Sequence, residues 1–120
     1  MAGMTMVMFE KWTTLTVKAT ATTTYRSEWF DVTGYSQTTV TVFLKNNNAG
    51  VTTKIQVEQS GDLDSFADAA TLTTLTEGQE RNVQVPSTAR YVRAAIVLEG
   101  GATVDGAATL WVKAVAREAL

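Results

Sequence analysis

Three carboxylates within one polar segment are the first residues whose spacing could bind a metal ion. Asp62, Asp64 and Asp68 could offer oxygen ligands to Ca²⁺. The segment lacks the central Gly and the closing Glu of an EF-hand loop, so we interpret these carboxylates as caps of a helical turn. We therefore predict no metal site and no bound cofactor.

The chain also lacks the residues of common enzyme chemistry. It contains no Cys and no His, which removes the usual ligands of zinc and the base of Ser-His and Cys-His catalysis. A glycosidase needs two carboxylates across a cleft, and 120 residues leave little material for deep walls. We predict no catalytic residues and no enzymatic activity.

The charge of the chain argues against nucleic acid and membrane as partners. Ten Lys and Arg stand against twelve Asp and Glu, so the chain has no excess of positive charge to bind phosphates. No apolar run approaches the roughly 20 residues of a membrane-spanning helix. Arg90 and Arg93 would lie on opposite faces of one strand, so they cannot form a single phosphate-binding patch. We expect at least one of them to form a structural ion pair or a contact between subunits.

Two aromatic residues are the strongest candidates for binding another protein. Phe43 and Trp111 each lie on the strand face opposite the aliphatic row of the same strand, so both would be exposed on a single chain. The aromatic residues of this chain could also stack on sugar rings, but core and interface positions are the commoner use. We predict that Phe43 and Trp111 contact another chain.

Residues 1–12 are expected to lie outside the folded domain, as a flexible end or an N-terminal arm. The segment is apolar, and its methionines could adapt to a partner surface. Its candidate interface residues are Met6, Met8 and Phe9. Because no basic residue precedes the apolar run and a Glu-Lys pair follows it at once, we predict no signal peptide.

The elements that must position these residues are predicted to be strands. The chain has 21 Thr and 14 Val, and β-branched residues favour strands over helices. Apolar and polar residues alternate with period two, which predicts strands over residues 13–24, 39–45, 51–58, 71–76, 81–85, 90–98 and 107–117. Residues 46–50 are rich in Asn and end in Gly, which tolerate positive φ, so they predict a hairpin between two paired strands.

Two segments depart from simple alternation. Residues 59–70 are predicted to form a loop with one helical turn, which has Leu63 and Phe66 on its buried side. Residues 90–98 are apolar on both faces, which is typical of a central strand. Seven to nine strands without a long helical period predict an all-β fold, an antiparallel β-sandwich that is jelly-roll-like, formed by one domain over residues 13–120.

A series of short motifs resembles small bacteriophage virion proteins over roughly residues 29–117. The motifs are FDVTGY at 30–35, IQVEQS at 55–60, DSFAD at 64–68, ARYVRA at 89–94, GG at 100–101 and LWVKAVA at 110–116. Members of that group are β-sandwiches that serve as head decoration (cement) proteins or as other structural parts of the virion. The strand that contains Arg90 and Arg93 also resembles discoidin-type sugar-binding sandwiches.

The resemblance implies a structural protein of a phage virion. It implies a head decoration protein that binds the major capsid protein on the outer capsid surface, stabilises the shell and forms a homo-oligomer, with a trimer favoured. The protein would be made in the host cytoplasm and would reside in the virion. The discoidin-like strand keeps a carbohydrate-binding module as the alternative, and a tail or connector component would share the same fold.

Overall fold

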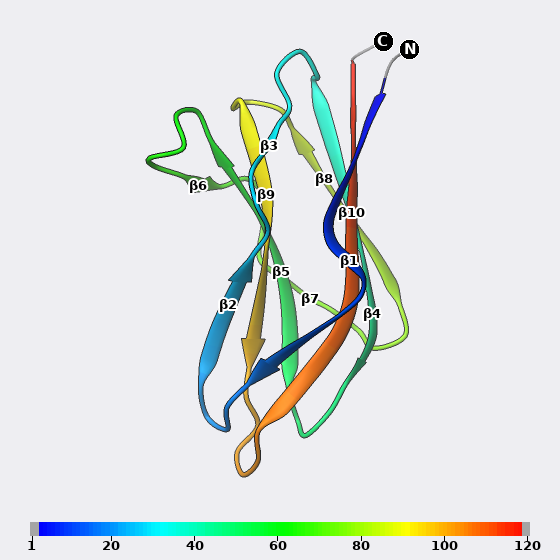
Figure 1. Cartoon of the computed structure of the whole chain (residues 1–120), viewed down its shortest axis with the longest axis vertical. Helices are drawn as coiled ribbons and strands as arrows, with labels where there is room; N and C mark the ends of the chain where they lie inside the picture. The colour runs from blue at the N-terminus through cyan, green and yellow to red at the C-terminus, as the bar shows by residue number, and fades with distance from the viewer. Residues whose placement is uncertain (1–2, 119–120) are drawn as a thin grey trace.

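The computed structural model describes residues 3–118, which form ten strands in two antiparallel sheets packed face to face (Figure 1). Among these residues, no helix is long and apolar enough to cross a membrane. The strands are β1 (Gly3–Val17), β2 (Thr22–Arg26), β3 (Phe30–Asp31), β4 (Gln37–Asn47), β5 (Thr52–Ser60), β6 (Ala67–Asp68), β7 (Thr73–Thr74), β8 (Glu80–Pro86), β9 (Tyr91–Glu99) and β10 (Gly106–Arg117).

The two sheets have the strand orders β1-β10-β4-β8 and β2-β9-β5-β6, and we refer to them as the β10 sheet and the β9 sheet. In the β9 sheet, β3 also pairs with β9 and β7 with β5. The longer strands fall alternately in the two sheets along the chain, which is the connectivity of a jelly roll. The predicted antiparallel sandwich is confirmed, and ten strands exceed the expected seven to nine because three strands have only two residues each.

The core lies between the sheets and consists of the apolar residues of the period-two pattern. The largest side chains that are less than 2% exposed come from both sheets: Val40, Val42, Leu44, Ile55, Val57, Val92, Ile96, Leu98, Leu110 and Val112. The alternate residues of the same strands point outward and are mostly Thr and charged residues. Strand β9 lies between β2 and β5, which agrees with the apolar character of both of its faces.

The N-terminal segment is part of the sandwich, which corrects the expectation of a separate arm over residues 1–12. Strand β1 starts at Gly3 and pairs with β10 along its length, while residues 1–2 lie outside the described part. Met6 and Met8 are 2% and 7% exposed and belong to the hydrophobic core. Alternating residues of β1 close the core beside β10, so their burial stabilises the fold.

The turn after β4 connects the two sheets instead of forming the predicted hairpin. Ala49 and Gly50 have the expected positive φ angles of 54° and 74°, and the Val51 amide donates to the Asn48 carbonyl at 3.0 Å. However, β4 pairs with β10 and β8, whereas β5 pairs with β9. The turn chemistry was predicted correctly, but the pairing of the two flanking strands was wrong.

The segment after β5 contains no helical turn in the described structure, and its two apolar side chains are exposed. Leu63 and Phe66 are each 50% exposed, which corrects the prediction that they are buried. The Asp62 carboxylate accepts hydrogen bonds from the amides of Asp64 and Ser65, at 2.9 and 3.0 Å. The Ser60 hydroxyl accepts from the Leu63 amide at 2.9 Å. These side-chain bonds satisfy the backbone in a non-helical conformation.

Candidate protein-protein contact surface

Three aromatic rings gather on the outer face of the β10 sheet. Phe43 and Trp111 are direct partners in the ladder between β4 and β10. The ring centre of Trp12 lies 5.4 Å from that of Phe43 and 6.3 Å from that of Trp111, with tilted and edge-to-face geometry. Trp12 is 38% exposed, and the other two rings are half-buried. We call Trp12, Phe43 and Trp111 the aromatic patch.

An irregularity in β1 places Trp12 over the other two rings. The register between β1 and β10 shifts after Val7 and again between Phe9 and Thr13. The Thr13 hydroxyl donates to the Glu10 carbonyl at 2.6 Å, which closes the irregular segment. A bulge of this kind changes the direction of a side chain relative to a regular strand. Trp12 was missed by the sequence analysis because regular alternation in the sequence starts only at residue 13.

Three lysines surround the aromatic patch and contact its tryptophan rings. The Lys11 ammonium lies 5.0 Å from the ring centre of Trp111, and the Lys113 ammonium lies 4.8 Å from the same ring. The Lys45 ammonium lies 5.3 Å from the Trp12 ring centre. These distances fall within the range of cation-π interactions. Between residues 3 and 118, the ion pairs involve other groups, and none of these three ammonium groups forms one.

The five predicted interface residues separate into two groups. Phe43 and Trp111 each lie on the outer face, as their position in the pattern predicted, and the pairing of β4 with β10 brings them together. Met6 and Met8 are buried in the core, and Phe9 is partly buried and packs against it. A single folded chain therefore does not offer these three residues as a free surface, because its own sheets already cover them.

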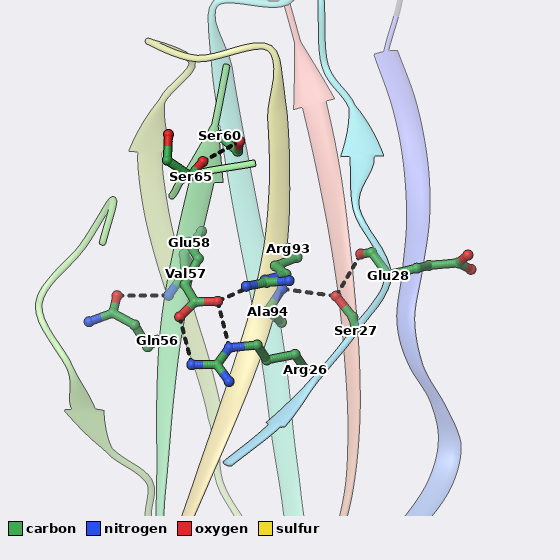
Figure 2. Close-up of polar contacts among 10 residues, drawn as sticks. All are labelled: Arg26, Ser27, Glu28, Gln56, Val57, Glu58, Ser60, Ser65, Arg93 and Ala94. Atoms are coloured by element: carbon green, nitrogen blue, oxygen red, sulfur yellow. Dashed lines mark hydrogen bonds and ion pairs between the residues drawn. The ribbon is translucent and has the colours of Figure 1, made fainter. Parts of the chain in front are cut away.

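The outer face of the β9 sheet carries a different cluster, and Figure 2 shows its charged residues Arg26, Glu58 and Arg93 in close-up. The Glu58 carboxylate is 4% exposed and accepts hydrogen bonds from Arg26 at 3.0 Å and from Arg93 at 2.8 Å. The Arg93 guanidinium lies 4.0 Å from the ring centre of Trp29 and 4.7 Å from that of Phe66. We call these five residues the arginine cluster. The guanidinium groups have both a carboxylate and aromatic partners within the chain.

The prediction that at least one of Arg90 and Arg93 forms a structural ion pair is confirmed, and both residues form one. Arg93 binds Glu58 within the arginine cluster, and Arg90 binds the Asp31 carboxylate at 3.2 Å. The Thr33 side chain and amide hydrogen bond to Asp31, and with Arg90 they hold the pKa of this carboxyl below its usual value. Both arginines therefore have partners within the same chain.

The acidic segment uses its first carboxylate to organise the backbone. Hydrogen bonds from the amides of Ser65 and Asp64 lower the pKa of Asp62, so this carboxylate is ionised at neutral pH. In the part of the chain that the structure describes, no three acidic side chains gather around a point that could hold a metal ion. The Asp62 carboxylate thus orders the loop by binding the backbone amides of the loop itself.

Comparison with known proteins relates the chain to others by fold. No family model matches the chain, and no curated protein matches its sequence. The PBSX exported protein XepA superposes with a TM-score of 0.66 at 14% identity, over 98% of this chain and 38% of that one. The VP2 subviral particle of infectious bursal disease virus superposes with a TM-score of 0.67 at 12% identity, over 98% and 32%. The chain thus spans about a third of the length of these proteins.

A carbohydrate-binding module of the β-sandwich superfamily aligns less closely than these two proteins. Its TM-score is 0.46 at 6% identity, over 89% of this chain and 54% of that one. The similarity to XepA and to VP2 establishes the same β-sandwich fold, while identities this low leave the function to be argued from the surface itself.

Proposed function

We propose that the protein is a non-enzymatic structural component of a phage virion, of the head decoration type. Its partners are the major capsid protein and further copies of the same chain. The observation that carries the proposal is the aromatic patch, because three clustered aromatic rings on the uncovered face of a sandwich are typical of a protein-protein contact. The fold shared with viral and phage proteins supports the same class.

The proposed mechanism is the burial of additional surface across the shell. Each copy would cover apolar area on its neighbours, and buried apolar area contributes about 25 cal/mol per Å². A protein that binds only the assembled shell stabilises that state by linkage. Contacts to more than one neighbour raise the apparent affinity further through multivalency.

One observation favours the alternative, a carbohydrate-binding module. Phe66 is 50% exposed and borders a hollow of about 260 Å³ with Gln59 and Ser60, so it could offer a face to a sugar ring. The Gln59 side-chain oxygen already accepts from the Thr88 hydroxyl at 2.8 Å, and the Ser60 hydroxyl already donates to the Ser65 carbonyl. Because these polar groups are engaged within the chain, we favour the structural role.

Mixing the purified protein with undecorated capsids tests the proposal. We expect saturable, stoichiometric binding and a higher melting temperature of the shell. Retention on a glycan array without capsid binding would instead support the carbohydrate-binding alternative. Binding to isolated tails or connectors but not to capsids would favour a different position in the virion.

A further inference from the structure

A second uncovered apolar surface lies in the loop that joins β5 to β6. Leu63 and Phe66 are each 50% exposed there. Asp62, Asp64 and Asp68 accompany them, and all three are exposed. We call residues 61–68 the acidic loop. Exposed apolar side chains beside exposed carboxylates form a surface that suits an apolar partner with positive charge around it.

The acidic loop is held in a defined conformation. The Ser60 hydroxyl and the Asp62 carboxylate hydrogen bond to the backbone of residues 63–65. Phe66 lies against the guanidinium groups of Arg26 and Arg93, with ring-centre distances of 5.4 and 4.7 Å. A loop that is ordered before binding loses less conformational entropy in a complex. The loop is therefore suited to act as a preformed contact element.

The charge of the acidic loop is complementary to that of the aromatic patch. At the patch, three lysines lie near the tryptophan rings, and the one acidic ladder partner of its rings is Glu80, opposite Phe43. In the loop, three exposed aspartates flank the two apolar residues in sequence, and the two arginines near Phe66 already share the carboxylate of Glu58. Contact between two aromatic patches would bring two sets of ammonium groups together, which disfavours a symmetric patch-to-patch dimer. Contact between a patch and an acidic loop pairs opposite charges around two apolar centres.

Within one chain these two surfaces lie on opposite sides of the sandwich. The aromatic patch belongs to β1, β4 and β10, and the acidic loop ends with β6, at the edge of the other sheet (Figure 1). A loop cannot reach the patch of its own chain. Each copy therefore has one patch and one loop available to two different neighbours.

We propose that copies of the chain associate head to tail, with the acidic loop of one copy seated on the aromatic patch of the next. This inference rests on the proposed structural role, since it assigns the patch to a second copy and leaves other faces for the capsid. Such a heterologous contact forms a ring if the rotation between copies closes, and an open chain if it does not. The trimer expected from the sequence corresponds to a ring of three.

Two variants that each disable one surface provide the test. Trp12→Ser with Lys113→Glu removes a ring and reverses a charge on the patch. Leu63→Asn with Asp64→Lys removes an exposed apolar side chain and reverses a charge on the loop, and Asn tolerates the positive φ of 68° at position 63. Circular dichroism checks that both variants retain the β-sheet spectrum. Leu72→Ser is the matched control, because Leu72 is 44% exposed and belongs to neither surface.

Light scattering of each variant and of their mixture gives the outcome. The average mass of the wild type and of the control should rise above the 12.9 kDa of one chain as concentration rises. The dissociation constant for self-association of each variant should be at least about tenfold higher than that of the wild type. An equimolar mixture should form complexes of two chains and no larger, because one intact patch and one intact loop remain per pair. Monomeric wild type, unimpaired self-association of the loop variant, or a mixture that stays monomeric would overturn the inference. Capsid binding measured separately tests the proposed function alone.

Discussion

The two outer faces of the sandwich combine aromatic rings with cations in different electrostatic settings. On the β9 sheet, Arg26 and Arg93 share the buried carboxylate of Glu58, and Arg93 stacks on an aromatic ring. On the β10 sheet, lysines approach tryptophan rings, and none of these lysines forms an ion pair among residues 3–118. In the first arrangement the charges are paired within one chain, whereas the second leaves unpaired charge and apolar area for a partner.

This comparison separates stability from binding. A buried carboxylate loses much of its hydration and depends on its cations, so disturbing it affects folding. An exposed cation on an aromatic ring remains hydrated and contributes less to the fold. Substitutions of the charged residues of the arginine cluster should therefore change the free energy of unfolding, and those in the aromatic patch should change association.

The largest effect is expected at Glu58. Glu58→Gln leaves Arg26 and Arg93 without their shared negative charge and should lower the free energy of unfolding by about 2–4 kcal/mol. Glu99→Gln is the matched control, because the pair of Glu99 with Lys54 is partly exposed and should contribute below about 1 kcal/mol. Urea denaturation measures both. Equal losses in the two variants would contradict the structural role of the arginine cluster.

A smaller difference is expected between two tryptophans. Trp29→Ala removes the ring that stacks on Arg93 and should cost about 1–2 kcal/mol of stability. Trp12→Ala removes a more exposed ring and should cost below about 1 kcal/mol, yet it should weaken self-association. Denaturation and light scattering on the same samples compare the two variants. A greater loss of stability in Trp12→Ala would reverse the assignment of the two faces.

The smallest effect is expected from lowering the pH, which protonates Asp62 in the acidic loop beside the arginine cluster. The pKa of Asp62 is lowered by hydrogen bonds from the amides of Ser65 and Asp64, so its ionised form stabilises the folded loop. That stability is present above the ordinary pKa of 3.8 and is lost as pH falls through the lower pKa of the folded state. Hydrogen exchange of the amides of Asp64 and Ser65, corrected for intrinsic rates, should show protection falling in this range.

Asp62→Asn provides the control for the acid effect. The Asn side chain carries no titratable carboxyl group. The backbone amides of Asp64 and Ser65 should therefore be less protected than in the wild type at neutral pH, and their protection should change little in acid. The pH is lowered in steps from neutral to about 2, well below the ordinary pKa of 3.8. If both loop amides of the wild type stay fully protected throughout, the Asp62 carboxylate is not the group that orders the loop.

Much of the fold follows from patterns within single strands. Alternation of apolar residues and the excess of Thr and Val predicted an all-β sandwich, and the position of Phe43 and Trp111 opposite the aliphatic rows predicted that each faces outward. The odd spacing of Arg90 and Arg93 likewise excluded a single phosphate-binding patch, and each arginine forms its own ion pair in the structure. Each of these predictions depends only on which face of a strand a residue occupies.

The wrong predictions concern relations between segments. A short turn with positive φ can join paired strands or connect two sheets, so residues 46–50 did not distinguish a hairpin from a crossover. Leu63 and Phe66 have the spacing of a helical turn, but hydrogen bonds from Ser60 and Asp62 support a loop that exposes both. Trp12 joined the patch through a bulge, whose position depends on pairing with β10.

Oxidative footprinting of the free chain and of assembled particles tests the central claim most directly. Mass spectrometry reads the reactivity of each aromatic side chain, and Tyr25, which lies outside both surfaces, serves as the reference. We predict that Trp12, Phe43 and Trp111 lose reactivity on assembly relative to Tyr25, because another protein covers the aromatic patch. Unchanged reactivity of all three in the assembled particle, with protection appearing on another face, would contradict it.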